Sequence, residues 1–184
     1  PVPCGLLMGD LRALPSVDRL LGDCGPLTDA HGRAAVTEAL RAAVGAGVGL
    51  LLTSLTLGLL THSGGLLDHP MLIAPFGASA FLIFVVPNSP MAQPWSSFIG
   101  NSVAALAAVA VLHTGLPALP AAALAVVLAV LAMSVLRAMH PPGGAVALAT
   151  VLSATPDHLP GLGFVALPVA AGTFLLVVLG IAWN

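Results

Sequence analysis

The sequence contains no lysine, and charged residues make up only 7% of the chain. Soluble domains carry roughly 25% charged residues, so this chain lacks an ordinary soluble surface. With a net charge of −2 it also lacks the basic face that a nucleic-acid partner requires, and we expect no such partner. Hydrophobic residues reach 58%, and the mean hydropathy is +1.06. The composition predicts an integral membrane protein whose surroundings are the lipid bilayer.

The few charges are concentrated at the start of the chain. Nine of the twelve lie at or before Arg41. We therefore expect a polar N-terminal segment over residues 1–36 and a transmembrane domain over residues 37–184. Apolar residues at helical spacing between Leu11 and Leu21 favour an amphipathic surface helix, with a partly ordered tail as the alternative. The only cysteines, Cys4 and Cys24, also lie here; the expected cytoplasmic location favours free thiols over a disulfide.

Six apolar segments follow, and they predict an all-α, polytopic helical bundle. Crossing a bilayer takes about 17 to 25 residues, and four uncharged segments reach that length: residues 42–61, 97–113, 120–136 and 162–183. Residues 71–86 and 141–154 are instead interrupted by proline and glycine. Counted from the prolines, each helical part is about a dozen residues, or roughly 18 Å. Each is thus a half-helix, a re-entrant element or a broken span.

The two interrupted segments resemble each other. Pro75–Ala80 (PFGASA) and Pro142–Ala147 (PGGAVA) share four of six residues. Each copy follows one full span and precedes another, which predicts two three-segment units, about 37–114 and 118–184, with the middle segment broken at a Pro-Gly-Ala start. If all six segments cross, the positive-inside rule places both termini in the cytoplasm and the units form an inverted repeat, a construction of secondary transporters. If the middle segments re-enter, the repeat is parallel.

A helix start within the membrane is a candidate anion site. Its backbone N–H groups are unpaired and carry partial positive charge, and glycine allows a ligand to come close. The alternative is that the glycines only let helices pack tightly. Neutral donors near the first break add further candidates. The predicted substrate-binding residues are Gly77, Ala78, Ser79, Gln93, Asn101, His140, Pro142, Gly143, Gly144 and Ala145.

His140 is the one ionisable side chain next to a broken helix start. It could gate, donate to an anion or take a coupling proton, or simply cap the helix. Arg137 could attract anions to a cytoplasmic mouth or anchor the helix at the interface. Four histidines fall on the predicted outer side, but none has tight ligand spacing, and we expect no metal: His62, His69, His113 and His158.

Three motifs in order are similar to those of the HPP family of integral membrane proteins. They are Ala74–Ala80, Pro87–Trp95 and Met139–Ala145, the last containing His-Pro-Pro. The resemblance covers roughly residues 37–183. Plastid and cyanobacterial members are associated with nitrite transport, so the resemblance implies a transporter or channel for a small inorganic anion, with nitrite the leading substrate.

Other function classes receive less support. The sequence shows no Ser-His-Asp set, no paired intramembrane carboxylates and no phosphate-loop motif, so we expect no enzyme and no cofactor. A non-transporting subunit of a larger membrane complex is the alternative, favoured by the short length and glycine-rich faces. A transporter of this size is expected to be a homo-oligomer. The alanine- and leucine-rich, lysine-free composition favours a bacterial inner membrane.

Overall fold

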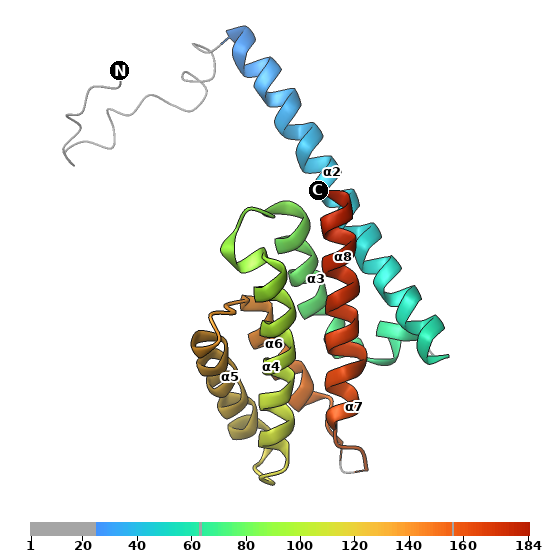
Figure 1. Cartoon of the computed structure of the whole chain (residues 1–184), viewed down its shortest axis with the longest axis vertical. Coiled ribbons are helices and arrows are strands. Elements are labelled where there is room, and N and C mark those ends of the chain that lie inside the picture. Colours follow the sequence, from blue (N-terminus) through green and yellow to red (C-terminus); the bar gives the residue numbers. More distant parts are fainter. Residues whose placement is uncertain (1–24, 63, 156) are drawn as a thin grey trace, which may run out of the picture. The chain divides into compact units, whose positions relative to one another are not determined.

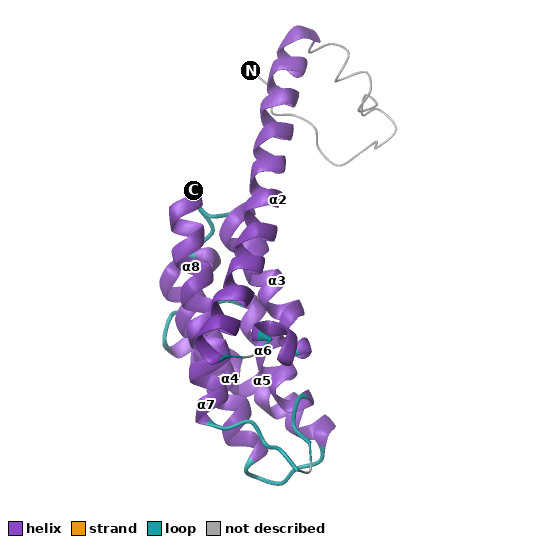
Figure 2. Cartoon of the chain, turned by 90° about the vertical axis from the view of Figure 1, so that its right-hand side faces the viewer, coloured by secondary structure: helices purple, strands orange, loops and turns teal. Residues whose placement is uncertain are grey.

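The computed structural model describes residues 25–62, 64–155 and 157–184. Within them the chain is helical apart from its loops and a single β-bridge between Thr155 and His158. Short 3-10 turns precede α3 and α4, and a π-helical turn joins α7 to α8 (Figures 1 and 2). The elements are α2 (Gly25–Thr61), η2 (Gly65–Asp68), α3 (Pro70–Val85), η3 (Pro90–Ala92), α4 (Pro94–Leu112), α5 (Ala118–Val135), α6 (Pro141–Leu152), α7 (Leu162–Phe164), η4 (Val165–Ala170) and α8 (Ala171–Trp183).

The chain divides into two compact units, Pro1–Leu40 and Arg41–Asn184. In the first unit, the described residues 25–40 are the beginning of α2. The predicted amphipathic stretch between Leu11 and Leu21 and both cysteines lie outside the described residues. The second unit contains every other helix and the candidate site.

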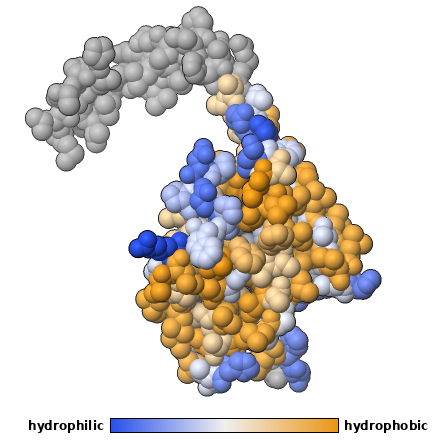
Figure 3. Space-filling model, viewed as in Figure 1, coloured by the Kyte–Doolittle hydropathy of each residue, from blue (hydrophilic) through white to orange (hydrophobic). Residues whose placement is uncertain are grey.

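Four described helical stretches are long and apolar enough to cross a membrane: Ala34–Thr61, Pro94–Leu112, Ala118–Val135 and Leu162–Trp183. The all-α, polytopic bundle that the sequence predicts is confirmed. α3 and α6, with 16 and 12 residues, correspond to helices of roughly 24 and 18 Å and are shorter than a usual span. Hydrophobic residues cover most of the face seen in Figure 3, as expected for a surface that meets lipid.

Small residues set the packing of the second unit. The buried residues of α4 include Gly100, Ala104, Ala105 and Ala108, whose small size lets neighbouring helices approach closely. A Cβ on Gly100 would lie 2.6 Å from the Cβ of His140, and one on Gly143 would lie 3.0 Å from the carbonyl oxygen of Gly100. α4 and the start of α6 are therefore so close at Gly100 and Gly143 that neither position has room for a side chain.

The helices of the second unit alternate in direction. In Figure 1, α3 runs upward, α4 downward, α5 upward, α6 downward and α8 upward to the C-terminus. Six crossings would produce this alternation. The shortness of α3 and α6 leaves the re-entrant alternative standing, and the inverted repeat stays a prediction.

One predicted helix start is wrong. α3 begins at Pro70, and Pro75 lies inside it, whereas the sequence placed the start at Pro75. An internal proline costs a hydrogen bond to the carbonyl four residues earlier. The extra turn forms nevertheless, because Pro70 is favourable at the first helical position and Leu72 becomes fully buried.

The last span is also less regular than predicted. The sequence indicates one helix over 162–183, but Leu167 has extended backbone angles (φ −136°, ψ 120°), and Pro168 follows it inside η4. A proline lacks the N–H that would continue the helical ladder. α8 therefore begins afresh at Ala171, two residues before Thr173.

Candidate functional site

Four fully buried polar side chains meet inside the second unit, each from a different helix. They are Ser79 of α3, Asn101 of α4, His140 at the start of α6 and Thr173 of α8, and we call them the polar cluster. Asn101 Nδ2 donates to Ser79 Oγ and to Thr173 Oγ1, both at 3.2 Å. Ser79 Oγ lies 2.9 Å from His140 Nε2. Buried polar groups away from water are costly unless they are paired, so the cluster ties four helices together.

A backbone carbonyl fixes the tautomer of His140. Its Nδ1 lies 2.8 Å from the carbonyl oxygen of Met91 in η3. A carbonyl can only accept, so Nδ1 carries a proton. In the neutral ring, Nε2 is then an acceptor, and Ser79 donates its hydroxyl proton to it.

One polar atom of the Asn101 side chain makes no hydrogen bond to any described residue. Its Oδ1 is buried and has no hydrogen-bond partner among the described residues. The two Nδ2 protons are both used, on Ser79 and Thr173. Leaving a buried acceptor unpaired costs roughly 1 to 3 kcal/mol, and such atoms in native structures often mark functional sites.

Two pockets lie at opposite ends of the contact between α3 and the last span. The first, about 330 Å³, is lined by His69, Leu72, Ser153, His158 and Phe164 among others; we call it the His69 pocket. The second, about 220 Å³, is lined by Ile83, Gln93, Val177, Gly180 and Asn184 among others; we call it the Gln93 pocket.

The polar cluster lies between these pockets. Along α3, Ser79 is seven residues from Leu72 and four from Ile83, or roughly 10 and 6 Å at 1.5 Å per residue. Along the last span, Thr173 falls between Phe164 and Val177 in the same way. The apolar residues Phe76 of α3 and Val169 of η4 are also fully buried in this part of the chain.

The His69 pocket has an apolar lining that also includes the polar side chains of Asp68, His69, Ser153 and His158. Burial lowers the pKa of His69, the neighbouring Asp68 raises it, and His158 lowers it. The ring of His69 packs edge-on against Phe164 at 5.4 Å between centroids. His62 and His113 are exposed elsewhere. In the described part of the chain no three His, Cys, Asp or Glu side chains are grouped to hold a metal ion.

The predicted site residues separate into two groups. The structure brings Ser79, Asn101 and His140 into direct contact. Gln93 lies apart from them: it lines the Gln93 pocket, and its Nε2 donates to the carbonyls of Pro87 and Ser89. Contact of any of these residues with a substrate stays a prediction.

The remaining predicted residues are the small ones near the prolines. Gly77 and Ala78 lie inside α3, where backbone N–H groups bond to carbonyls four residues earlier, so they offer no free donors. Pro142 and Gly143 are buried, Gly144 is half-buried and Ala145 is exposed.

The start of α6 is where the sequence placed it, at Pro141. It nevertheless has few backbone donors. Pro141 and Pro142 have no N–H, and the N–H of Gly143 donates to the carbonyl of His140 at 2.8 Å. Side chains, rather than the backbone of this helix start, thus supply the donors of the cluster.

Two members of the arrangement escaped sequence reasoning. Thr173 is the only hydroxyl residue in the apolar segment 162–183, a signal that could have identified it. The Met91 carbonyl carries no sequence signal, because any residue could supply it.

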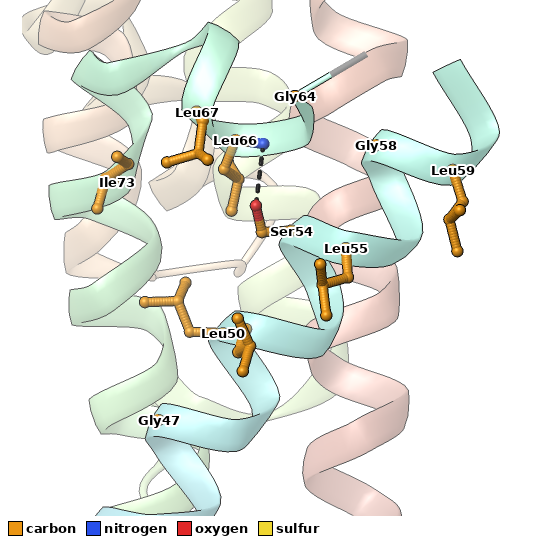
Figure 4. Close-up of a pocket in the computed structure, with 11 residues that line it drawn as sticks. Gly47, Leu50, Ser54, Leu55, Gly58, Leu59, Gly64, Leu66, Leu67 and Ile73 are labelled. Carbon is orange, nitrogen blue, oxygen red and sulfur yellow. Dashed lines mark hydrogen bonds between the residues drawn. The ribbon is translucent and has the colours of Figure 1, made fainter. Parts of the chain in front are cut away.

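A further hollow differs from the two pockets described above. It measures about 700 Å³ and lies along α2 and η2, lined by leucines and glycines such as Gly47, Leu50 and Gly58 (Figure 4). Its one drawn hydrogen bond runs from the N–H of Leu66 to Ser54 Oγ, at 3.2 Å. With so few polar groups it does not suit a small anion.

The fold and the buried cluster define the class: a multi-pass α-helical membrane protein. The family follows from comparison. The model of the HPP transmembrane region matches residues 31–184, and the chain belongs to this family. A second model, the selenocysteine synthase N-terminal region, matches only residues 11–46.

Two relatives are transmembrane proteins of Dictyostelium discoideum. One is 38% identical over 117 residues, covering 61% of this chain and 37% of the relative. The other is 35% identical over 131 residues, covering 68% of this chain and 46% of the relative. The chain thus spans less than half the length of either relative. No solved structure matches.

Proposed function

We propose that this chain is a membrane transporter or channel for a small anion, with nitrite the leading substrate. The observation that carries the proposal is the position of the polar cluster between two pockets that lie at opposite ends of one helix contact. In a domain whose other packing is largely apolar, buried polar side chains mark substrate paths. The nitrite assignment rests on the family resemblance.

The chemistry of the cluster favours an anion over a cation. Its side chains are two hydroxyls, an amide and an imidazole, all of which can donate. None of them is a carboxylate, the group that usually binds cations. Arg137, exposed in the loop before His140, is the only lysine or arginine after Arg41 and would draw anions toward this end of the protein.

The mechanism differs from one based on paired helix starts. Since Gly77 and Ala78 lie inside α3, the anion would be held at Asn101, the central residue of the polar cluster, instead of by backbone N–H groups at two breaks. The two three-segment units, about 37–114 and 118–184, would form an inverted repeat with both termini in the cytoplasm. They would rock against each other and open each pocket toward the cluster in turn. Such a protein would work as a homo-oligomer in a bacterial inner membrane and would carry out no enzymatic reaction.

The test is nitrite uptake into liposomes that contain the purified protein. Asn101→Leu removes every polar atom of the central residue while keeping its size, and it should abolish uptake. Ser102→Ala is the matched control: it lies next in α4, and its hydroxyl bonds only to the Phe98 carbonyl of its own helix. Equal uptake by Asn101→Leu and the unaltered protein would refute the site.

A non-transporting subunit remains the second candidate, favoured by the short length of α3 and α6 and by the 700 Å³ apolar groove. Such a subunit should co-purify with a stoichiometric partner and show no flux of nitrite, nitrate or formate. It should also tolerate Asn101→Leu if the partner still binds.

A further inference from the structure

The hydrogen bonds of the polar cluster form one chain whose direction is set by a single proton. The chain runs from the Met91 carbonyl through His140, Ser79 and Asn101 to Thr173. Its first member can only accept. Every other member except the ring has a donor and an acceptor that can exchange roles, because hydroxyls rotate and amides flip.

With a neutral ring the direction is fixed as observed. His140 Nδ1–H donates to Met91, so Nε2 accepts from the Ser79 hydroxyl. The lone pairs of Ser79 then accept from Asn101 Nδ2, which also donates to Thr173. Asn101 Oδ1 is left as the unpaired atom. In this state the cluster presents a bare acceptor, which repels an anion.

A proton on Nε2 reverses the chain. The ring then donates at both nitrogens, and Ser79 receives the Nε2–H bond instead of making one. The Ser79 hydroxyl is then available to donate a hydrogen bond to Asn101, and the only acceptor atom of the Asn101 side chain is Oδ1. Asn101 flips, Thr173 donates to the same Oδ1, and both Nδ2 protons become free. The cluster now has a positive charge and two unpaired donors at the position where Oδ1 was.

We propose that the cluster binds a small anion together with a proton, so that the protein is a proton–anion symporter. This rests on the proposed transport function and adds its coupling ion. On the entry side, hydronium gives up a proton to His140 Nε2, so one O–H bond breaks as the N–H bond forms, and the anion binds at Asn101 Nδ2. On the other side the N–H bond breaks, the proton returns to water, and the anion leaves with it. Nothing is oxidised or reduced.

No other charge near the ring can take over this role. The groups that contact His140 are the Met91 carbonyl from η3, Ser79 from α3 and the backbone of Gly100 from α4, all of them neutral. An anion buried here without the His140 proton would be uncompensated, which is costly in a low-dielectric interior.

The experiment measures nitrite and proton entry together in liposomes carrying a trapped pH dye, at mildly alkaline pH and with the membrane voltage clamped to zero. Empty vesicles supply the background from undissociated acid crossing the lipid. The expected result for the unaltered protein is one proton entering with each nitrite, and nitrite accumulation when only a pH gradient is imposed.

A pair of variants separates coupling from folding. Ser79→Ala cuts the chain between His140 and Asn101, so the ratio of protons to nitrite should fall toward zero whatever flux remains. Ser97→Ala also removes a fully buried serine, one turn from Asn101 in α4, but its hydroxyl bonds only to the Ala92 carbonyl. This control should keep the ratio.

The outcomes distinguish the two proposals. Nitrite flux without proton entry, or an unchanged ratio in Ser79→Ala, would overturn the symport inference and leave the transport function standing. Absence of flux for every small anion would overturn both.

Discussion

The contact between α4 and α6 yields a prediction that depends on packing alone. Gly100 faces the start of α6, where an added Cβ would lie 2.6 Å from His140 Cβ and 2.9 Å from the Ala138 carbonyl oxygen. Carbon atoms pack at about 3.5 to 4.0 Å, so Gly100→Ala must push α6 away by about 1 Å. The same shift would stretch the 2.9 Å contact between Ser79 and His140 beyond hydrogen-bond range.

The magnitude follows from comparison with a second glycine. Overpacking a tight contact costs about 1 to 3 kcal/mol, whereas alanine in a helix gains up to about 1 kcal/mol over glycine. Gly144→Ala isolates the gain, because a Cβ there meets no atom within 4 Å. The stability of Gly100→Ala should therefore lie about 1 to 3 kcal/mol below that of Gly144→Ala.

The assay is denaturant unfolding of both variants in the same detergent, followed by tryptophan fluorescence and analysed by linear extrapolation. Gly144→Ala should match or exceed the unaltered protein, and Gly100→Ala should unfold at lower denaturant with lower nitrite uptake. Equal unfolding midpoints for the two variants would refute the close contact between α4 and α6.

Two other predictions concern single residues. Arg137 has positive φ (52°) at the end of α5, where the Ala138 and Arg137 N–H groups bond back to the carbonyls of Met133 and Ser134. Arg137→Gly should stabilise this turn by about 1 kcal/mol in unfolding measurements, yet slow nitrite uptake at low salt; faster unfolding would contradict the first part and unchanged uptake the second. The pKa of His69 is lowered chiefly by burial, so near and below the ordinary histidine pKa of about 6.5 the unfolded chain binds more protons than the folded chain. Stability should then decrease as the pH falls further, and His69→Gln should reduce that decrease; an identical pH profile in the variant would exclude His69 as its source.

Much of the fold was predictable because several helix boundaries lie at or next to prolines in the sequence. α5 and α6 end within two residues of the predicted positions, and α6 starts at Pro141, a residue suited to the first helical position. The start of α3 was not predictable in this way, since Pro70 and Pro75 can both begin a helix. The choice depends on the burial of Leu72, which only the tertiary structure shows.

Most residues of the polar cluster could be predicted from the sequence, but the hydrogen bonds between them could not. Ser79, Asn101 and His140 stand out as polar residues within or beside apolar segments. Their hydrogen bonds, however, join positions 22 to 72 residues apart, which no local pattern encodes. The expectation of backbone donors at two helix starts is wrong for Gly77 and Ala78, because α3 begins at Pro70 and both residues lie inside it.

The shortness of α6 explains why the cluster can exist. A continuous span would bury its backbone groups in its own hydrogen bonds and leave only side chains for contact. Because α6 begins inside the bundle, His140 has extended backbone angles (φ −140°, ψ 98°), and its ring reaches the Met91 carbonyl of another irregular segment, η3. A helical carbonyl would already be occupied by an N–H four residues later. The interrupted helix therefore supplies the position of the histidine, and the η3 turn supplies the acceptor that fixes its tautomer. In the proposed mechanism, a side chain whose protonation can change thus takes the role that the sequence analysis gave to backbone N–H groups.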